Sequence, residues 1–132
     1  MFFLENKIVV ITGASSGIGE ASALAFAKEG STVVLVARRL ERLKQLQEKI
    51  NSLGVSSLAV KTDISKQAEV KKLFLEVEKK YGRVDILINN AGIGRNFELE
   101  NTSTRDWQDT FDINVTGVFY CTQETARLMR KY

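Results

Sequence analysis

The chain has 132 residues, of which 44% are hydrophobic and 27% charged, which provides enough apolar material for one globular domain and excludes a disordered segment. Its formal net charge of +3 comes from 19 basic and 16 acidic residues spread along the sequence, without the basic block typical of nucleic-acid binding. With no histidine and one cysteine, Cys121, the usual zinc sites, His-activated nucleophiles and an internal disulfide are excluded as well.

These features also lead to expectations about the surroundings of the protein. The lone Cys121 indicates a reducing, cytoplasmic location, and no metal site is expected. The N-terminus reaches Glu5 after only three apolar residues, which is too short for a signal peptide or a membrane span. We therefore expect neither a membrane nor a nucleic acid as a partner.

In chain order, apolar runs of strand length alternate with segments of helical periodicity, a rhythm typical of βαβ units around a parallel sheet. The expected strands are residues 7–12, 31–37, 57–61 and 84–89. The expected helices are residues 17–29, 40–53, 66–81 and, after a loop through Thr104, a long final helix over 105–131. We predict one α/β unit, residues 1–132: a Rossmann-type sheet of strand order 3-2-1-4 with helices on both faces, truncated after the long helix.

The segment between the first strand and the first helix, Thr-Gly-Ala-Ser-Ser-Gly-Ile-Gly at residues 12–19, is rich in glycine. Glycines let the backbone turn tightly and approach a pyrophosphate, whose charge the helix N-terminus attracts. No Lys-Ser/Thr pair follows, so a dinucleotide is favoured over a nucleoside triphosphate. The alternative is a purely structural turn. The residues of this segment expected to bind a cofactor are Gly13, Ser15, Ser16, Gly17, Ile18 and Gly19.

The end of the second strand bears on which dinucleotide is bound. A carboxylate about 20 residues after the glycines would bind the ribose diol of NAD. Ala37 is instead followed by Arg38 and Arg39, whose guanidinium groups suit a ribose 2′-phosphate. We therefore predict NADP(H) rather than NAD, the alternative being that both arginines are solvated surface charges.

Together with Asn89-Asn90-Ala91-Gly92 after the fourth strand and Asn114 in the last helix, the glycine pattern resembles the short-chain dehydrogenase/reductase family along essentially the whole chain. The resemblance implies a seven-stranded parallel sheet in the complete fold, with the Asn-Asn-Ala-Gly segment beside the cofactor ribose. It also implies that Asn114 is a catalytic residue whose backbone carbonyl holds a water of the proton relay; read alone, this polar residue could simply face a neighbouring loop. The further cofactor-binding residues that it implies are Asp63, Ile64, Asn90, Ala91, Gly92 and Ile113.

Asp63 has two interpretations. The resemblance places it where the family hydrogen-bonds the adenine amine, whereas the residues alone make it an N-cap candidate for the third helix.

The family's chemistry also requires a serine and a Tyr-x-x-x-Lys pair, in which the lysine lowers the pKa of the tyrosine that transfers the substrate proton. None of the three tyrosines meets this requirement, because Asp85 follows Tyr81 by four residues, Glu124 follows Tyr120, and nothing follows Tyr132. We expect an NADP(H)-dependent oxidoreductase acting on a carbonyl or alcohol that is inactive on its own. The alternatives are a non-catalytic nucleotide-binding or oligomerising module, or a fragment.

The fourth strand and the last helix indicate a missing partner. The strand has the apolar character of an interior strand but would lie at the edge of the sheet, where it would recruit another strand. The helix is apolar on more than one side, with Trp107, Phe111, Val115 and Val118 along one of them. We expect a homo-oligomer or pairing with a complementary C-terminal half.

Overall fold

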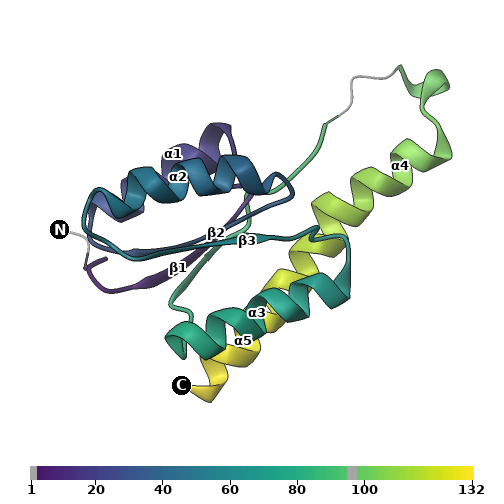
Figure 1. Ribbon diagram of the computed structural model, residues 1–132. Coiled ribbons are helices and arrows are strands. Elements are labelled where there is room, and N and C mark those ends of the chain that lie inside the picture. Colours follow the sequence, from purple (N-terminus) through teal and green to yellow (C-terminus); the bar gives the residue numbers. More distant parts are fainter. Residues whose placement is uncertain (1–2, 95–97) are drawn as a thin grey trace.

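The computed structural model contains a four-stranded parallel sheet in the order β3-β2-β1-β4, as predicted (Figure 1). It describes residues 3–94 and 98–132; residues 95–97, within the loop expected before the last helix, lie outside the described residues, as do residues 1–2. The strands are β1 (Ile8–Thr12), β2 (Thr32–Ala37), β3 (Ser57–Lys61) and β4 (Ile86–Ile88). Strand β1 lies in the middle, where Val10 pairs with Val34 of β2 and Leu87 of β4. Because all strands are parallel, their carboxyl ends share one edge of the sheet.

Helices cover both faces of this sheet. In Figure 1, α1 (Gly17–Lys28) and α2 (Leu40–Asn51) lie on one face, and α3 (Gln67–Tyr81) and α5 (Val118–Lys131) lie on the other. The predicted final helix is helical throughout, but it is not one regular α-helix. It consists of α4 (Thr104–Phe111), a π-helical turn η2 (Asp112–Gly117) and α5, and a short 3-10 turn η1 (Leu99–Asn101) precedes it.

The core follows from the alternation of side chains along the strands. Ile8 and Val10 of β1 point toward α3 and α5, while Val9 and Ile11 point toward α1 and α2. All four are buried, as expected for a parallel sheet covered on both faces. The helices contribute residues at helical spacing, such as Leu43, Leu46 and Ile50 of α2.

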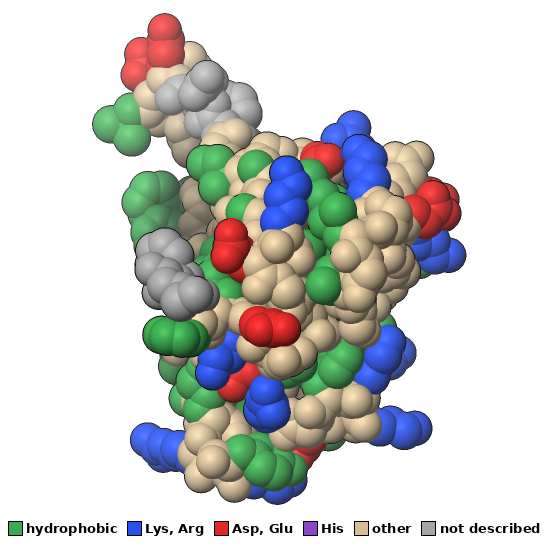
Figure 2. All heavy atoms as spheres, turned by 90° about the vertical axis from the view of Figure 1, so that its left-hand side faces the viewer, with side chains coloured by type: hydrophobic (Ala, Val, Ile, Leu, Met, Phe, Trp, Pro, Cys, Tyr) green, Lys and Arg blue, Asp and Glu red, His purple; other side chains and the backbone are tan. Residues whose placement is uncertain are grey.

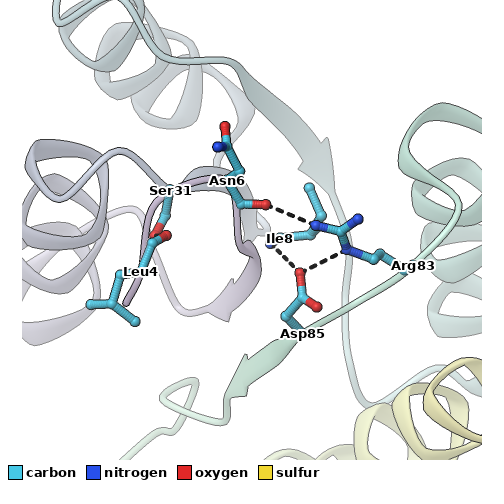
Figure 3. A network of polar contacts seen from close by, with 6 residues as sticks. All are labelled: Leu4, Asn6, Ile8, Ser31, Arg83 and Asp85. Atoms are coloured by element: carbon cyan, nitrogen blue, oxygen red, sulfur yellow. Dashed lines mark hydrogen bonds and ion pairs between the residues drawn. The ribbon is translucent and has the colours of Figure 1, made fainter. Parts of the chain in front are cut away.

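At the amino edge of the sheet, polar groups tie β1 to β4 (Figure 3). The backbone N–H of Ile8 donates to Asp85 Oδ2 at 2.7 Å, and Arg83 Nε donates to the same oxygen at 3.0 Å. Arg83 Nη2 also donates to the carbonyl of Asn6 at 3.0 Å. Close by, Ser31 Oγ donates to the carbonyl of Leu4 at 2.7 Å. These bonds satisfy the backbone groups of the segment that enters β1.

The continuous helical segment made by α4, η2 and α5, which we call the helical rod, projects beyond the sheet. Figure 1 shows α5 beside α3, whereas α4 extends away from the rest of the fold. An apolar stripe runs along the exposed side of this rod, made by Trp107, Phe111, Val115 and Phe119, which are 42–57% exposed. We call these four residues the apolar stripe.

The surface that faces the amino edge of the sheet carries lysine and arginine side chains scattered among carboxylates and polar groups, rather than one basic patch (Figure 2). Among the described residues, no helix has the length and apolar character needed to cross a membrane.

Candidate functional site at the carboxyl edge of the sheet

A cavity of about 420 Å³ lies where the carboxyl ends of the four strands meet. Such an edge is the usual ligand-binding position of open α/β sheets, because the loops after the strands converge there. The predicted residues that line it are Gly13, Ser15, Ser16, Arg38, Arg39, Asp63, Ile64, Asn90, Ala91, Gly92 and Ile113. Gly17, Ile18, Gly19 and Asn114 lie outside this lining, and the side chain of Ile18 is largely exposed. The lining residues that the sequence did not predict are Val36, Ala37, Thr62 and Ile93.

The glycines between β1 and the first turn of α1 are required for different structural reasons. Gly13 has φ +66° and Gly17 has φ +56°, left-handed backbone conformations that residues with a side chain rarely adopt. At Gly19 the limit is space, since a Cβ there would lie 2.1 Å from the carbonyl oxygen of Gly13 and 2.6 Å from Asn90 Nδ2. The N-cap residue of α1, Ser16, makes no side-chain cap hydrogen bond. The N-terminus of α1 is therefore suited to an anionic group.

Thr12 and Asn90 fix this loop to the segment after β4. Thr12 Oγ1 accepts hydrogen bonds from the backbone N–H groups of Asn90 and Ala91 at 3.1 and 3.0 Å. In return, Asn90 Nδ2 donates to the carbonyls of Thr12 and Gly13 at 3.1 and 3.2 Å. These bonds hold together the part of the cavity lining made by Gly13, Asn90 and Ala91, which we call its floor.

The two arginines after β2 lie at the side of the cavity. Arg39 Nη2 donates to Ser15 Oγ at 3.1 Å and to Ser16 Oγ at 3.3 Å, so the guanidinium lies against the glycine loop. Arg38 lines this cavity and also a smaller one of about 180 Å³ beside it. That smaller cavity is also lined by Asp63, Ser65, Ile93, Asp109, Asp112 and Ile113.

Asp63 is not the N-cap of α3, because that position is held by Lys66, so the N-cap interpretation is wrong. The Asp63 carboxylate instead organises the turn before the helix, accepting hydrogen bonds on Oδ1 from the backbone N–H and the hydroxyl of Ser65 at 3.0 and 2.6 Å. Its backbone N–H donates to Glu69 Oε2 at 2.6 Å. The chain is thus fixed where Asp63 enters the cavity lining.

Asn114 lies in η2, and its amide pairs with the backbone of Ile93. Asn114 Oδ1 accepts from the Ile93 N–H and Nδ2 donates to the Ile93 carbonyl, both at 2.8 Å. The side chain therefore contacts a neighbouring loop, as its second interpretation expects, and the predicted role of the backbone carbonyl is compatible with this contact. Asn114 thus lies in a π-helical turn, a feature that is frequent at functional sites.

The sheet order, the glycine loop and the cavity together define a Rossmann-type dinucleotide-binding fold. The family model described as short chain dehydrogenase matches residues 7–132. The chain therefore belongs to the short-chain dehydrogenase/reductase family of oxidoreductases, which bind nicotinamide dinucleotides.

Its relatives include enzymes with different substrates in their names. The chain is 40% identical to a 3beta-hydroxysteroid dehydrogenase from Mediterraneibacter gnavus, over 96% of this chain and 46% of that protein. It is 42% identical to a farnesol dehydrogenase from Aedes aegypti, over 96% of this chain and 52% of that protein.

Among solved structures, L-sorbose reductase from Gluconobacter frateurii, complexed with NADPH and L-sorbose, has a TM-score of 0.92 and 36% identity, covering 96% of this chain and 49% of that one. The chain thus spans about half the length of the relatives it matches.

Proposed function

We propose that this chain is the cofactor-binding part of an NADP(H)-dependent oxidoreductase that transfers a hydride between the nicotinamide and a carbonyl or alcohol. The observation that carries the cofactor choice is the pair of arginines, Arg38 and Arg39, in the cavity lining directly after β2. A carboxylate at this place would bind the ribose diol of NAD, but it would repel the 2′-phosphate of NADP. Two guanidinium groups favour that phosphate through charge-assisted hydrogen bonds.

The residues present fit such a dinucleotide. The turn at Gly13 and the N-terminus of α1 offer backbone N–H groups and a positive helix end to the pyrophosphate. A Cβ on Gly17 would meet no atom of the described residues within 4 Å, so a ligand has space to approach the backbone there. Asp63 and Ile64 line the side of the cavity where the adenine is proposed to lie, and Asn90 to Gly92 the side of the second ribose.

When bound, the nicotinamide supplies or accepts the hydride, and the chain's own residues position it. Asn114 holds the backbone of Ile93 at the rim of the cavity, and its own backbone carbonyl is the proposed acceptor for a water of the proton relay. We further propose that turnover needs a serine, a tyrosine and a lysine that these 132 residues do not supply. Without them, the rate should fall by several orders of magnitude.

A titration of the 132-residue polypeptide with NADPH and NADH, followed by nicotinamide fluorescence, tests the cofactor assignment. Replacing Arg38 by Asp should weaken NADPH binding by about tenfold to a hundredfold and reverse the preference, because it exchanges attraction for repulsion. Arg42→Asp is the matched control, since Arg42 is exposed on α2 outside the cavity lining and the change in net charge is the same. Equal loss in both variants, or an unchanged preference in Arg38→Asp, would contradict the proposal.

The same titration, with a carbonyl substrate added, tests the requirement for further groups. Saturable NADPH binding without reduction is the expected result. Turnover at ordinary enzymatic rates by these 132 residues would show that the acid/base group lies among them.

The apolar stripe and the position of β4 at the end of the strand order support a second proposal, that the chain self-associates or pairs with a complementary C-terminal half. The stripe offers adjacent aromatic rings, Trp107 and Phe111, with centroids 4.8 Å apart. Such an exposed apolar surface is typical of a protein interface. A molar mass of one chain at high micromolar concentration would contradict self-association. Separately, we propose a reducing, cytoplasmic location, because the single cysteine, Cys121, is free and cannot form an internal disulfide.

A further inference from the structure

Gly117 stands inside a helical rod where its conformational freedom is not used. Its φ and ψ are −62° and −39°, ordinary helical values that any residue adopts. Alanine is the better helix former at such a place, so the glycine must be explained by a contact rather than by the backbone. Gly117 is buried, and it ends the π-helical turn η2 that also contains Asn114.

The contact is with Ile64, which lines the cavity. A Cβ on Gly117 would lie 2.7 Å from Ile64 Cγ1, 2.8 Å from its Cδ1 and 3.1 Å from its carbonyl oxygen. Ile64 is 5% exposed and belongs to the core beneath the sheet, so its side chain has little room to turn away. The helical rod therefore approaches the loop after β3 as closely as a residue without a side chain allows, and Figure 1 shows it passing the end of β3.

The same turn also contacts the loop after β4, through Asn114. Its amide binds both the N–H and the carbonyl of Ile93, at 2.8 Å each. Ile64 and Ile93 follow different strands, β3 and β4, and both line the cavity. One helical turn thus contacts the two loops between which the ligand is proposed to lie.

We propose that η2 is a clamp that sets the distance between these two loops, and that Gly117 is a positioning residue for nucleotide binding. By the η2 clamp we mean Asn114 and Gly117 together with their partners Ile93 and Ile64. The ligand assigned to the clamp rests on the proposed function, whereas the coupling between the two loops rests on the contacts alone.

A methyl group on Gly117 would have only two ways to be accommodated. If the helix keeps its place, Ile64 and the adjoining Asp63 move into the cavity lining. If the loop keeps its place, the helix moves and draws Asn114 away from Ile93. Either movement changes the width of the cavity, although alanine itself favours the helix.

The test compares Gly117→Ala with Ile64→Ala, the double variant Gly117→Ala/Ile64→Ala, and Gly94→Ala as the matched control, since a Cβ at Gly94 meets no atom of the described chain within 4 Å. Affinities for NADPH and for adenosine 2′,5′-bisphosphate are measured by calorimetry. Hydrogen exchange of the Ile93 amide is measured in the absence of ligand, because that amide is bonded to Asn114.

We expect Gly117→Ala to lower the affinity for both ligands by about tenfold, while Gly94→Ala binds them as the wild type does. The double variant should bind within about threefold of Ile64→Ala alone, because removing the Ile64 side chain makes room for the methyl group. Faster exchange at the Ile93 amide in Gly117→Ala is expected if the helix gives way, and unchanged exchange with a displaced Asp63 amide resonance if the loop does.

Wild-type affinity in Gly117→Ala would overturn the clamp. So would a double variant whose loss of affinity equals the sum of the losses in the two single variants. A wild-type chain that binds neither ligand would overturn the proposed function and the ligand assigned to the clamp. The exchange and resonance measurements would in that case still decide whether η2 couples the two loops.

Discussion

The strands β1 and β4 have different surroundings at the amino edge of the sheet, where they begin, and at the carboxyl edge, where they end. At the amino edge, the segments entering β1 and β4 are closed by polar groups of the chain itself, with Asp85 accepting from both Ile8 and Arg83. At the carboxyl edge, the same two strands lead into loops whose bonds, such as those of Thr12 and Asn90, lie around a cavity of about 420 Å³.

This contrast indicates that the ligand-binding capacity of the fold lies at the carboxyl edge of the sheet. Glycines at the carboxyl edge remove side chains and leave a helix N-terminus facing the cavity, which is useful only if a ligand occupies that space. The polar groups at the amino edge are used for folding. Substitutions at the carboxyl edge should therefore change nucleotide binding, and substitutions at the amino edge should change stability alone.

The largest effect is expected for Gly19→Ala. Its methyl group would meet the carbonyl oxygen of Gly13 at 2.1 Å, so the loop must be displaced. We expect a loss of about 3 kcal/mol in the free energy of unfolding and no NADPH binding at millimolar concentration, measured by urea denaturation and titration. Gly54→Ala is the contrast: its Cβ meets open space, and its φ of +81° costs about 1 kcal/mol, without effect on NADPH affinity. Normal NADPH binding by Gly19→Ala would show that the glycine loop is not the site that binds the cofactor.

A smaller loss is expected for Thr12→Val, which removes the acceptor of the Asn90 and Ala91 N–H groups. Two partly buried donors without a partner should cost about 2 kcal/mol of stability and also weaken NADPH binding, because the floor of the cavity loosens. Thr12→Ser keeps the hydroxyl and should bind NADPH normally. Wild-type NADPH affinity in Thr12→Val would show that these two hydrogen bonds do not contribute to the nucleotide site.

At the amino edge, Asp85→Ala should cost about 1–2 kcal/mol of stability at neutral pH and leave NADPH affinity unchanged. Burial raises the pKa of Asp85, but the hydrogen bond from Ile8 and the interactions with Arg83 outweigh it, so the pKa lies below the ordinary value of 3.8. A carboxyl group with a depressed folded-state pKa stabilises above the unfolded-state pKa and loses that contribution as pH falls through the folded-state value.

The stability difference between wild type and Asp85→Ala should therefore be constant above about pH 5 and shrink below pH 3.8. Denaturation at several pH values measures it. Asp85→Asn, which retains an acceptor for Ile8, should lose less. A difference that grows on acidification, or a change in NADPH affinity, would contradict the separation between the two edges.

The smallest effect is expected for Ser31→Ala, also at the amino edge. The hydroxyl of Ser31 donates one hydrogen bond, to the carbonyl of Leu4 at 2.7 Å. Its loss should lower the free energy of unfolding by about 1 kcal/mol and leave titrations with NADPH unchanged. A loss of affinity in this variant would mean that the amino edge communicates with the cavity.

The glycine loop and Arg38 could be predicted from their places after β1 and β2, whereas Asp63 and Asn90 were implied only by the family resemblance. Parallel strands gather the residues that follow them at one edge of the sheet. Arg38, Asp63 and Asn90 each follow a strand, and the structure brings all three into one cavity lining. Thr62 directly follows β3 and Ile93 lies in the segment after β4. Neither side chain carries a charge that would have marked it as a site residue, so both were missed.

Other features depend on contacts that the sequence pattern does not specify. The predicted helix over residues 105–131 gave no sign of the π-helical turn Asp112–Gly117, because its apolar pattern is compatible with a regular helix. The contact of Gly117 with Ile64 requires the packed structure. At the amino edge, the bond from Arg83 to Asn6 joins residues 77 positions apart and includes a non-glycine residue, Asn6, at φ +62°.

Backbone amide resonances of the 132-residue chain, followed during titration with NADPH, test most directly whether the carboxyl edge is the nucleotide site. The predicted result is saturation below millimolar concentration, with the largest shifts at residues 13–19 and at Arg38, Asp63 and Asn90, and little change at Ile8 or Asp85. No saturation at millimolar NADPH, or shifts centred on the amino edge, would contradict the account.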